Sequence, residues 1–540
     1  MKNEDTERTA AIKHGYSFVT AFLLTLSLLA VPALGQYEEY RLEGGLYTAY
    51  YGCSVSIDGD VALIGAYEDS VGQIEGGAAY VFRYDSGAGS WISEATLYPA
   101  DLQYHDWFGG SVSVDGEIAL IGTYDAEAAY VFRYNPGTGA WSEEEKLTAS
   151  DGVWGDDFGH FVALSGEVAL VGAPTDDDVA DNAGSVYVFR YNPGSNSWVE
   201  ETELHASDAD NDDRFGLCVA FDGDIALIGS RHDDDNGSDS GSVYFFRYDP
   251  GSGSWTEEAK LFASDGSADD YFGTSVSLDL TSNVALIGSP ADDDNGAKSG
   301  SAYVFRYDPG TESWVEEAKL LASDGKAKDG FGSVAVNGNI ALVGAGQYGM
   351  ISGGTGPGAA YLFNYDPGSG TWSQGSKLLA SDGNKNDGFG MDVAISGNVS
   401  LVGAAYSNSD VAYIHDATMA PAVPDIKADG GDGPLSVPST QAVTLTLSLD
   451  PGDLSAKHDY WVGAVLNGSS LFCWTLPGTW VACPGFVPVR AYSGSLVGLN
   501  NYAFHQGTIP TGTWSFAFAV DIRQDKYEGT YKDTIQITSY

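Results

Sequence analysis

The sequence predicts an all-β protein: a seven-bladed β-propeller closed by an N-terminal strand, followed by a small β-sandwich. Three observations support this: a repeated unit, four strand-like segments within each unit, and the end of the repeat near residue 416. Self-similarity at a fixed period is the signature of a repeat architecture. The units open on aromatic–glycine pairs 50 to 59 residues apart, namely Tyr51-Gly52, Phe108-Gly109, Phe158-Gly159, Phe215-Gly216, Phe272-Gly273, Phe331-Gly332 and Phe389-Gly390.

Each copy contains four strand-like segments, as the copy between residues 272 and 330 illustrates. The first is Ser275–Leu278; the second (Val284–Gly288) and third (Ala302–Tyr307) are apolar on both faces; the fourth (Trp314–Leu320) alternates. Strands that are apolar on both faces need packing layers on both sides, and an alternating strand is half solvated. Four antiparallel strands repeated around an axis form the blades of a propeller, so seven openings predict seven blades.

The last copy lacks a fourth strand. It has its first three strands, which end at Tyr413–His415, and then runs into an irregular segment. Residues 37–42 match part of a fourth strand elsewhere in the chain, Glu257–Leu261. We therefore expect residues 37–43 to complete blade seven beside residues 411–415, so that the propeller covers residues 36–416.

The repeat resembles the FG-GAP repeat, the unit of the integrin α-subunit propeller and of many bacterial extracellular proteins. The aromatic–glycine openings supply one half of that motif. Gly172-Ala173-Pro174 supplies the other half, and weaker versions are Gly288-Ser289-Pro290, Gly65-Ala66, Gly344-Ala345 and Gly403-Ala404. The resemblance implies a propeller used for extracellular recognition. Tyr303–Phe305 followed by Trp314 also resembles, more weakly, the Kelch repeat, which forms propellers too.

Acidic side chains gather in the loops expected on one face of the disc. These are the loops between the second and third strands and those between successive blades. The candidates for binding a ligand or a cation are Asp176, Asp178, Asp233, Asp235, Asn236, Asp292, Asp294 and Asn295. The alternative is that these side chains only cap turns.

Calcium is a candidate ligand of the same loops, and no other cofactor is expected. Calcium-binding FG-GAP copies carry an Asp-x-Asp-x-Asp-Gly loop, because Ca²⁺ takes six or more oxygen ligands. Aligning Gly237 and Gly296 with the glycine of that loop puts His232 and Ala291 at its first position. The first ligand is therefore missing in both loops.

The composition excludes two classes of partner. The chain of 540 residues has a net charge of −50 and a pI near 4.1. Nucleic acid and anionic lipid are repelled by such a charge. The charge otherwise serves solubility. The histidines are scattered and no nucleophile motif occurs, so no catalytic site is predicted.

The first 35 residues have the features of a signal peptide. Lys2, Arg8 and Lys13 precede an apolar segment at Phe18–Val31, and Ala33-Leu34-Gly35 suits cleavage before residue 36. An uncleaved anchor is the alternative, although the segment is short for a membrane span. We expect a secreted or cell-surface protein without membrane insertion after cleavage.

The four cysteines fall into two kinds. Cys473 and Cys483 flank a turn at Leu476–Thr479, and a disulfide between them is expected in an oxidising compartment. Cys53 and Cys218 lie just after aromatic–glycine pairs of separate blades. Both are expected to be small buried apolar residues.

The repeat pattern stops before a predicted linker at residues 417–424. Beyond it, residues 425–540 contain short strands separated by Pro and Gly turns, which suits an Ig-like β-sandwich. Such a domain would act as a spacer or as a second adhesive module.

The function expected from the sequence is non-catalytic binding. An exported, monomeric adhesion-type protein would use the acidic face of an integrin α-like propeller to recognise an extracellular protein or glycan. The alternatives are an extracellular enzyme that acts on polysaccharide and a structural component of the cell envelope. Because a fold hosts many functions, the ligand rests on analogy.

Overall fold

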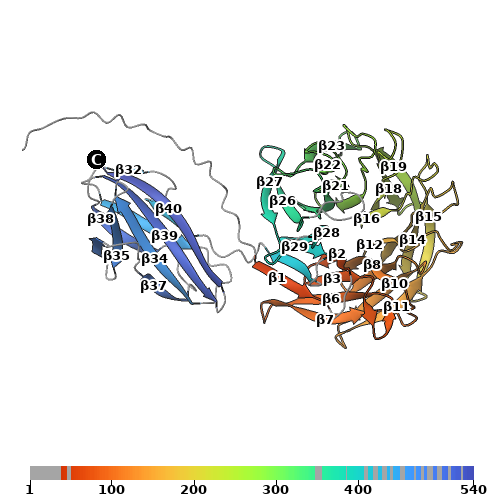
Figure 1. Ribbon diagram of the computed structural model, residues 1–540, viewed down its shortest axis with the longest axis horizontal. Helices are drawn as coiled ribbons and strands as arrows, with labels where there is room; N and C mark the ends of the chain where they lie inside the picture. Colours follow the sequence, from red (N-terminus) through yellow and green to blue (C-terminus); the bar gives the residue numbers. More distant parts are fainter. Residues whose placement is uncertain are drawn as a thin grey trace, which may run out of the picture. The chain divides into compact units, whose positions relative to one another are not determined.

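The computed structural model describes residues 38–44, 50–346, 356–384, 386–406 and 411–416, together with backbone strands between residues 424 and 539. The predicted signal peptide and the predicted linker up to residue 423 lie outside these residues. In the described residues all regular structure is β, which arranges residues 38–416 as a ring of blades (Figure 1). No helix of the described part is long and apolar enough to cross a membrane.

Seven four-stranded antiparallel sheets form the propeller, which confirms the predicted all-β, seven-bladed architecture. The innermost strands are β2 (Tyr51–Asp58), β8 (Phe108–Asp115), β12 (Phe161–Ser165), β16 (Cys218–Asp222), β20 (Ser275–Asp279), β24 (Phe331–Asn337) and β28 (Phe389–Ser396). The second strands are β3 (Val61–Ala66), β9 (Ile118–Thr123), β13 (Val168–Ala173), β17 (Ile225–Ser230), β21 (Val284–Ser289), β25 (Ile340–Ala345) and β29 (Val399–Ala404).

The outer half of each blade consists of a third and a fourth strand. The third strands are β6 (Ala78–Asp85), β10 (Ala129–Asn135), β14 (Ser185–Asn192), β18 (Ser242–Asp249), β22 (Ser301–Asp308), β26 (Ala359–Asp366) and β30 (Val411–Asp416). The fourth strands are β7 (Ser90–Leu97), β11 (Ala140–Leu147), β15 (Ser197–Leu204), β19 (Ser254–Leu261), β23 (Ser313–Leu320), β27 (Thr371–Leu378) and, for blade seven, β1 (Glu38–Glu43). A small hairpin of β4 (Ser70–Val71) and β5 (Ile74–Glu75) follows β3.

Burial within a blade follows the sequence pattern of its strands. The second strand of blade five, β21, is buried at every residue from Val284 to Ser289, because neighbouring blades cover both of its faces. The third strand, β22, is buried from Ser301 to Phe305 and emerges at Arg306. The apolar residues of adjacent blades form shared cores, so each blade is held in the ring by the blade on either side.

Glycine contacts set the spacing between blades. In every pair of neighbouring blades, the glycine near the end of a second strand lies against the carbonyl oxygen of the glycine in the next aromatic–glycine pair. A Cβ atom at the first glycine would overlap that oxygen. The pairs are Gly65 with Gly109, Gly122 with Gly159, Gly172 with Gly216, Gly229 with Gly273, Gly288 with Gly332, Gly344 with Gly390 and Gly403 with Gly52.

Side chains of the innermost strands tie the blades together around the central channel. The N–H of Val112 donates to Ser54 Oγ of the preceding blade at 3.0 Å, and the N–H of Val162 donates likewise to Ser111 Oγ at 3.0 Å. Between blade seven and blade one an aspartate does the same, because the N–H of Val55 donates to Asp392 Oδ2 at 2.7 Å.

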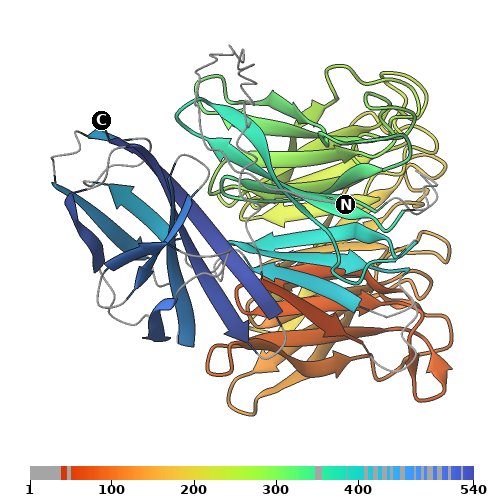
Figure 2. The same cartoon turned by 60° about the vertical axis from the view of Figure 1, so that its left-hand side comes forward.

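Strand β1 pairs antiparallel with β30, from Glu38 opposite Asp416 to Glu43 opposite Val411. Figures 1 and 2 show this red strand beside the cyan strands of blade seven. Glu39 accepts hydrogen bonds from Ser381 N and Oγ. Glu200 of blade three accepts the same two bonds from Ser150, so β1 makes a contact that the regular fourth strands also make.

A β-bulge alters the expected alternation of the fourth strands. In blade five the register shifts between Val304 and Phe305, opposite the fourth strand. The predicted solvent-facing side of β23 is therefore only partly solvated. Glu317 pairs with Arg306 at 2.9 Å and accepts the indole N–H of Trp372 from the next blade at 3.0 Å, while the Lys319 side chain is only 16% exposed.

The C-terminal strands form two sheets. A three-stranded sheet has the order β31 (Pro424–Ala428), β33 (Ala442–Leu449), β38 (Tyr502–Thr508). The seven-stranded sheet contains β32 (Leu435–Val437), β40 (Tyr527–Ser539), β39 (Gly512–Gln524), β34 (Lys457–Leu466), β35 (Ser470–Thr475) and β36 (Thr479–Ala482), with β37 (Arg490–Ser495) also paired to β34. Cys473 lies on β35 opposite Val481, and Cys483 lies outside the described residues, so the disulfide stays a prediction.

We expect Gly172→Ala to destabilise the propeller by about 3 kcal/mol, because the new Cβ would overlap the Gly216 carbonyl at a close-packed blade boundary. Gly166→Ala is the control. Its φ of +56° disfavours alanine, yet no atom lies within 4 Å of the added Cβ, so a loss of about 1 kcal/mol is expected. Equal losses in urea unfolding would contradict the spacing role of the glycine contact.

Candidate functional site

The loops between second and third strands and the loops between blades emerge on one face of the propeller, called here the loop face. Each third strand contributes a tyrosine whose hydroxyl donates to a loop aspartate. In blade three Tyr187 donates to Asp176 at 2.9 Å and to Asp151 at 3.1 Å. The corresponding tyrosines of the other blades are Tyr80, Tyr130, Tyr244, Tyr303, Tyr361 and Tyr413.

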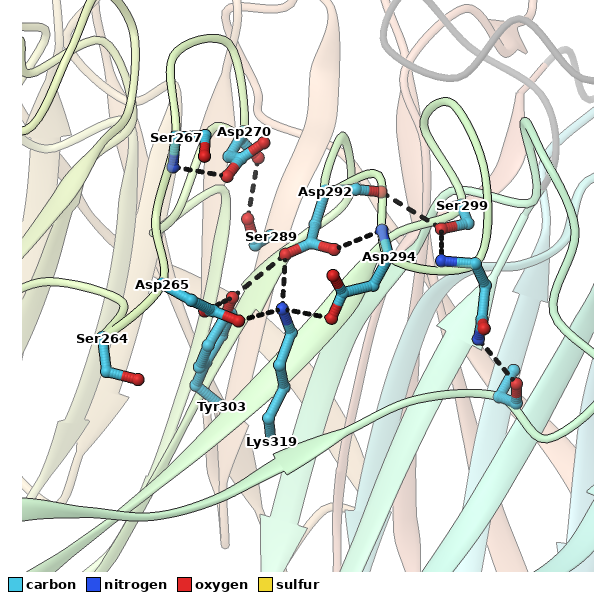
Figure 3. Close-up of polar contacts among 12 residues, drawn as sticks. Ser264, Asp265, Ser267, Asp270, Ser289, Asp292, Asp294, Ser299, Tyr303 and Lys319 are labelled. Carbon is cyan, nitrogen blue, oxygen red and sulfur yellow. Dashed lines mark hydrogen bonds and ion pairs between the residues drawn. The ribbon is translucent and has the colours of Figure 1, made fainter.

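In blade five a lysine ammonium occupies the centre of the acidic loop (Figure 3). Lys319 Nζ lies 2.8 Å from Asp265, 2.8 Å from Asp292 and 2.7 Å from Asp294. Burial opposes the charge of Lys319, but hydrogen bonds to these three carboxylates hold its pKa above the usual range. Asp292 is only 3% exposed, so this arrangement neutralises a buried carboxylate.

Blade four repeats this arrangement. Lys260 Nζ lies 2.8 Å from Asp208 and 2.7 Å from both Asp233 and Asp235. Four of the predicted site residues (Asp233, Asp235, Asp292 and Asp294) thus surround an ammonium group of the chain itself.

The two predicted asparagines differ from each other. Asn295 is engaged by its own loops, since its N–H donates to Ser299 Oγ at 3.1 Å and its Nδ2 donates to the Ala322 carbonyl at 3.1 Å. Asn236 is exposed. A binding role for the asparagines and the aspartates stays a prediction.

Blade three reverses the central charge of this cluster. The position of Lys260 and Lys319 on the fourth strand is held by Glu203, while Asp151, Asp176 and Asp178 keep the surrounding places. Oxygen atoms of Asp151, Asp178 and Glu203 lie within 4.8 Å of one another, which makes this group able to hold a metal ion. Burial raises the pKa of Glu203, and the Asp176 charge raises the pKa of Asp178.

A second group of side chains lies at the inner ends of the same loops. The residue before each aromatic–glycine pair has a positive φ in all seven blades, and in five of them it is not glycine. These five are Tyr50, Trp107, Asp157, Arg214 and Tyr271, with φ between 53° and 58°. Non-glycine residues in this conformation are strained, and such strain clusters at functional sites.

Contacts link these residues into a partial ring around the end of the central channel. Tyr50 stacks on Tyr67 with ring centroids 4.7 Å apart, Tyr67 lies 5.2 Å from Tyr124, and Tyr124 stacks on His160 at 4.5 Å. We call the following residues the inner ring; each is half-buried: Tyr50, Tyr67, Trp107, Tyr124, His160, Arg214, Arg231, Tyr271 and Tyr406.

Two arginines form the cationic part of the inner ring. Arg214 lies in the loop before β16 and Arg231 directly follows β17, close enough for the charge of Arg214 to act on the Arg231 guanidinium. The Arg231 guanidinium lies 5.9 Å from the centre of the Tyr271 ring. Burial lowers the pKa of His160 to about 4, an effect that the charges of Arg231 and Arg214 strengthen and that of Asp157 opposes.

The inner ring was not identified from the sequence. In the sequence His160 is one of several scattered histidines, and no pattern distinguishes Arg214 or Arg231. Aligning the residue before each aromatic–glycine pair across the copies would have shown the variation Tyr, Trp, Asp, Arg, Tyr, Gly, Gly on an otherwise constant frame.

The channel wall also carries groups with altered acidity. Burial raises the pKa of the Asp392 carboxyl to about 6, and burial raises the pKa of Cys53 and Cys218 to about 12. Both cysteines are free thiols. Cys218 is buried, as expected, and Cys53 is partly buried.

The fold and these loops define a β-propeller whose loop face is acidic outside and aromatic and cationic near the channel. The chain belongs to the FG-GAP repeat family. The family's model matches residues 43–82, 91–132, 141–189, 198–246, 255–305, 314–363 and 372–414, together more than half of the chain. No curated protein matches the chain.

Solved structures of low sequence identity resemble it as well. Saccharomyces cerevisiae Sqt1 is 10% identical, with 70% of this chain and 97% of that chain covered and a TM-score of 0.39. A putative 6-phosphogluconolactonase from Bacteroides fragilis is 12% identical, with 73% and 94% covered and a TM-score of 0.43. An oligogalacturonate lyase in complex with manganese is 9% identical, with 70% and 90% covered and a TM-score of 0.36. Similarity at this level says nothing about the activity of this chain.

We expect Glu203→Lys to stabilise the protein by about 1 kcal/mol, because it would rebuild in blade three the ammonium–carboxylate cluster of blades four and five. The reverse change, Lys319→Glu, would leave Asp292 buried without its cation and cost about 3 kcal/mol. Thermal unfolding at pH 7 measures both. A lower melting temperature for a folded Glu203→Lys variant would contradict the equivalence of the three clusters.

Proposed function

We propose that this protein is an exported, non-catalytic binding protein that recognises an extracellular ligand with its loop face. One observation carries the proposal: the residue before each aromatic–glycine pair keeps one left-handed backbone conformation in every blade, while its side chain changes from copy to copy. A constant frame with variable side chains is what recognition requires, since rigid scaffolds position the loops that carry function.

The composition of the inner ring supports this proposal. Its tyrosines and tryptophan combine an apolar ring with a polar edge, and such residues are enriched at binding surfaces. All nine inner-ring residues are half-buried, so ring faces and edges remain open to a ligand. Tyr104 and Trp154, in neighbouring interblade loops, are 62% and 82% exposed and extend this aromatic character outward.

Replacing Trp107 by glycine tests this role. Trp107 has a φ of 53°, so glycine relieves backbone strain and should leave stability equal or higher by about 1 kcal/mol, while ligand binding falls. Asn283→Gly is the matched control: it has a φ of 55° and is exposed in a hairpin between the first and second strands, on the opposite face. It should not change binding.

The measurement is a glycan and extracellular-protein array with the full mature chain, followed by assays for released reducing ends. Binding without turnover that Trp107→Gly weakens and Asn283→Gly does not is the expected result. Release of reducing ends would instead favour the polysaccharide-acting enzyme. Absence of any binding would favour a structural component of the envelope.

We further propose that β1 closes the ring and that residues 425–540 form an Ig-like accessory sandwich. The closure is supported by the pairing of β1 with β30 and by the buried position of Leu42, 2% exposed. Leu204 holds the equivalent place in blade three.

Both Leu42→Ala and Leu204→Ala should cost about 2–4 kcal/mol, because each leaves a cavity in a blade core. Only Leu42→Ala should speed hydrogen exchange at the amides of residues 411–416. Unchanged exchange there would argue against closure by β1.

A further inference from the structure

Among the residues that the structure describes, Arg214 and Arg231 have no carboxylate partner, although the protein has an excess of acid. In the propeller, six other arginines are described, and each forms an ion pair with a carboxylate: Arg41, Arg83, Arg133, Arg190, Arg247 and Arg306. For Arg214 and Arg231 no such pair exists among these residues. The two arginines without a carboxylate partner both lie in blade four, at its loop-face end.

The surroundings of the two guanidinium groups make the lack of a carboxylate partner unfavourable for the stability of the fold. The two arginines lie near each other in loops at the same end of blade four, and like charges at short range repel. Burial lowers the pKa of Arg231, and the charge of Arg214 lowers it further. A partly buried cation without a counter-charge is unfavourable, so the fold maintains this pair at the expense of stability.

The acidic side chains nearest to the two arginines either bond to another residue or form no ion pair with them. Asp239 accepts from His232 Nδ1 at 2.6 Å, and the Nε of Arg231 donates to His232 Nε2 at 3.1 Å, so the histidine stands between Arg231 and that carboxylate. Asp157 acts electrostatically on His160 rather than as an ion-pair partner of either arginine. The remaining N–H groups of both guanidinium groups have no partner among the described residues.

Aromatic rings flank the arginine pair on both sides. Tyr271 lies under the Arg231 guanidinium, and His232 contacts Tyr271 edge-on at 5.5 Å. On the other side, His160 stacks on Tyr124, and the aromatic contacts continue to Tyr67. The N–H groups of a planar guanidinium can bind both oxygens of a carboxylate, and aromatic faces can pack on a ring. Together they suit a ligand that has a carboxylate attached to a ring.

We propose that the ligand of the inner ring is an acidic sugar, whose carboxylate is held by Arg214 and Arg231 and whose ring packs on the neighbouring aromatic side chains. This inference rests on the proposed function and specifies its ligand. Two guanidinium groups supply the donors that a carboxylate accepts, and the ligand's charge removes their mutual repulsion. The protein as a whole repels anions because its net charge is −50, so an acidic ligand depends on local cations such as this pair.

The test is calorimetric titration of the full mature chain with uronic-acid trisaccharides and with the neutral trisaccharides of the same sugars. Uronates should bind about tenfold or more tightly than their neutral counterparts, and affinity should fall as NaCl rises. Arg231→Gln and Arg214→Gln should each weaken uronate binding about tenfold or more, since each removes charge-assisted hydrogen bonds. Arg247→Gln, which breaks an ordinary Arg–Glu pair on an outer strand, should leave binding unchanged.

Stability separates a binding role from a structural one. Because the variants relieve repulsion, Arg231→Gln and Arg214→Gln should melt at the same or a higher temperature than the parent. Lower melting temperatures together with weaker binding would assign the arginines to the fold and overturn the inference. Equal binding of neutral and acidic sugars, or binding of an acidic peptide instead, would overturn it and leave the proposed function standing. No binding to any sugar or protein would overturn both.

Discussion

The contact between two glycines at each blade boundary determines how closely the sheets of the propeller approach. The Gly216 carbonyl meets Gly172 with no Cβ between them, and the same contact recurs at all seven boundaries, including Gly403 with Gly52. This approach brings innermost strands near enough for Ser54 and its equivalents to accept backbone N–H groups of the next blade. The two halves of the family's motif therefore act on each other across blades, the second half of one copy touching the first half of the next.

Charge in this protein is organised by position within the blade. Outer strands pair arginine with glutamate, as Arg306 does with Glu317, and the loop clusters of blades four and five enclose lysines. Much of the acid near the core is thus matched locally. Blade three has Glu203 in the place of the lysine, and blade four has two arginines without carboxylate partners. These neighbouring departures have opposite sign, and both lie on the loop face.

The repeat made the fold predictable, because seven copies of Phe-Gly, an apolar second strand and a Trp-containing outer strand admit few other architectures. The acidic loops were also predictable as a group. What could not be predicted was the partner of each carboxylate: Lys319 lies on a fourth strand whose alternation predicts that it is half solvated, and the bulge opposite Phe305 changes that alternation. The inner ring was missed for a related reason. Arg214 and Arg231 are 17 residues apart in sequence, in the loops that precede β16 and follow β17, and the fold brings these loops to the same end of blade four.

The left-handed residue before each aromatic–glycine pair has a consequence for variation within the family. The same backbone conformation recurs there in every blade whichever side chain is present, so the residue can be exchanged in one copy while the frame of the blade is kept. Glycine, tyrosine, tryptophan, aspartate and arginine all occur there in this one chain. The propeller thus offers seven equivalent positions around one end of its central axis. Duplication of the repeat creates these positions, and point mutation can change the side chain at each of them separately.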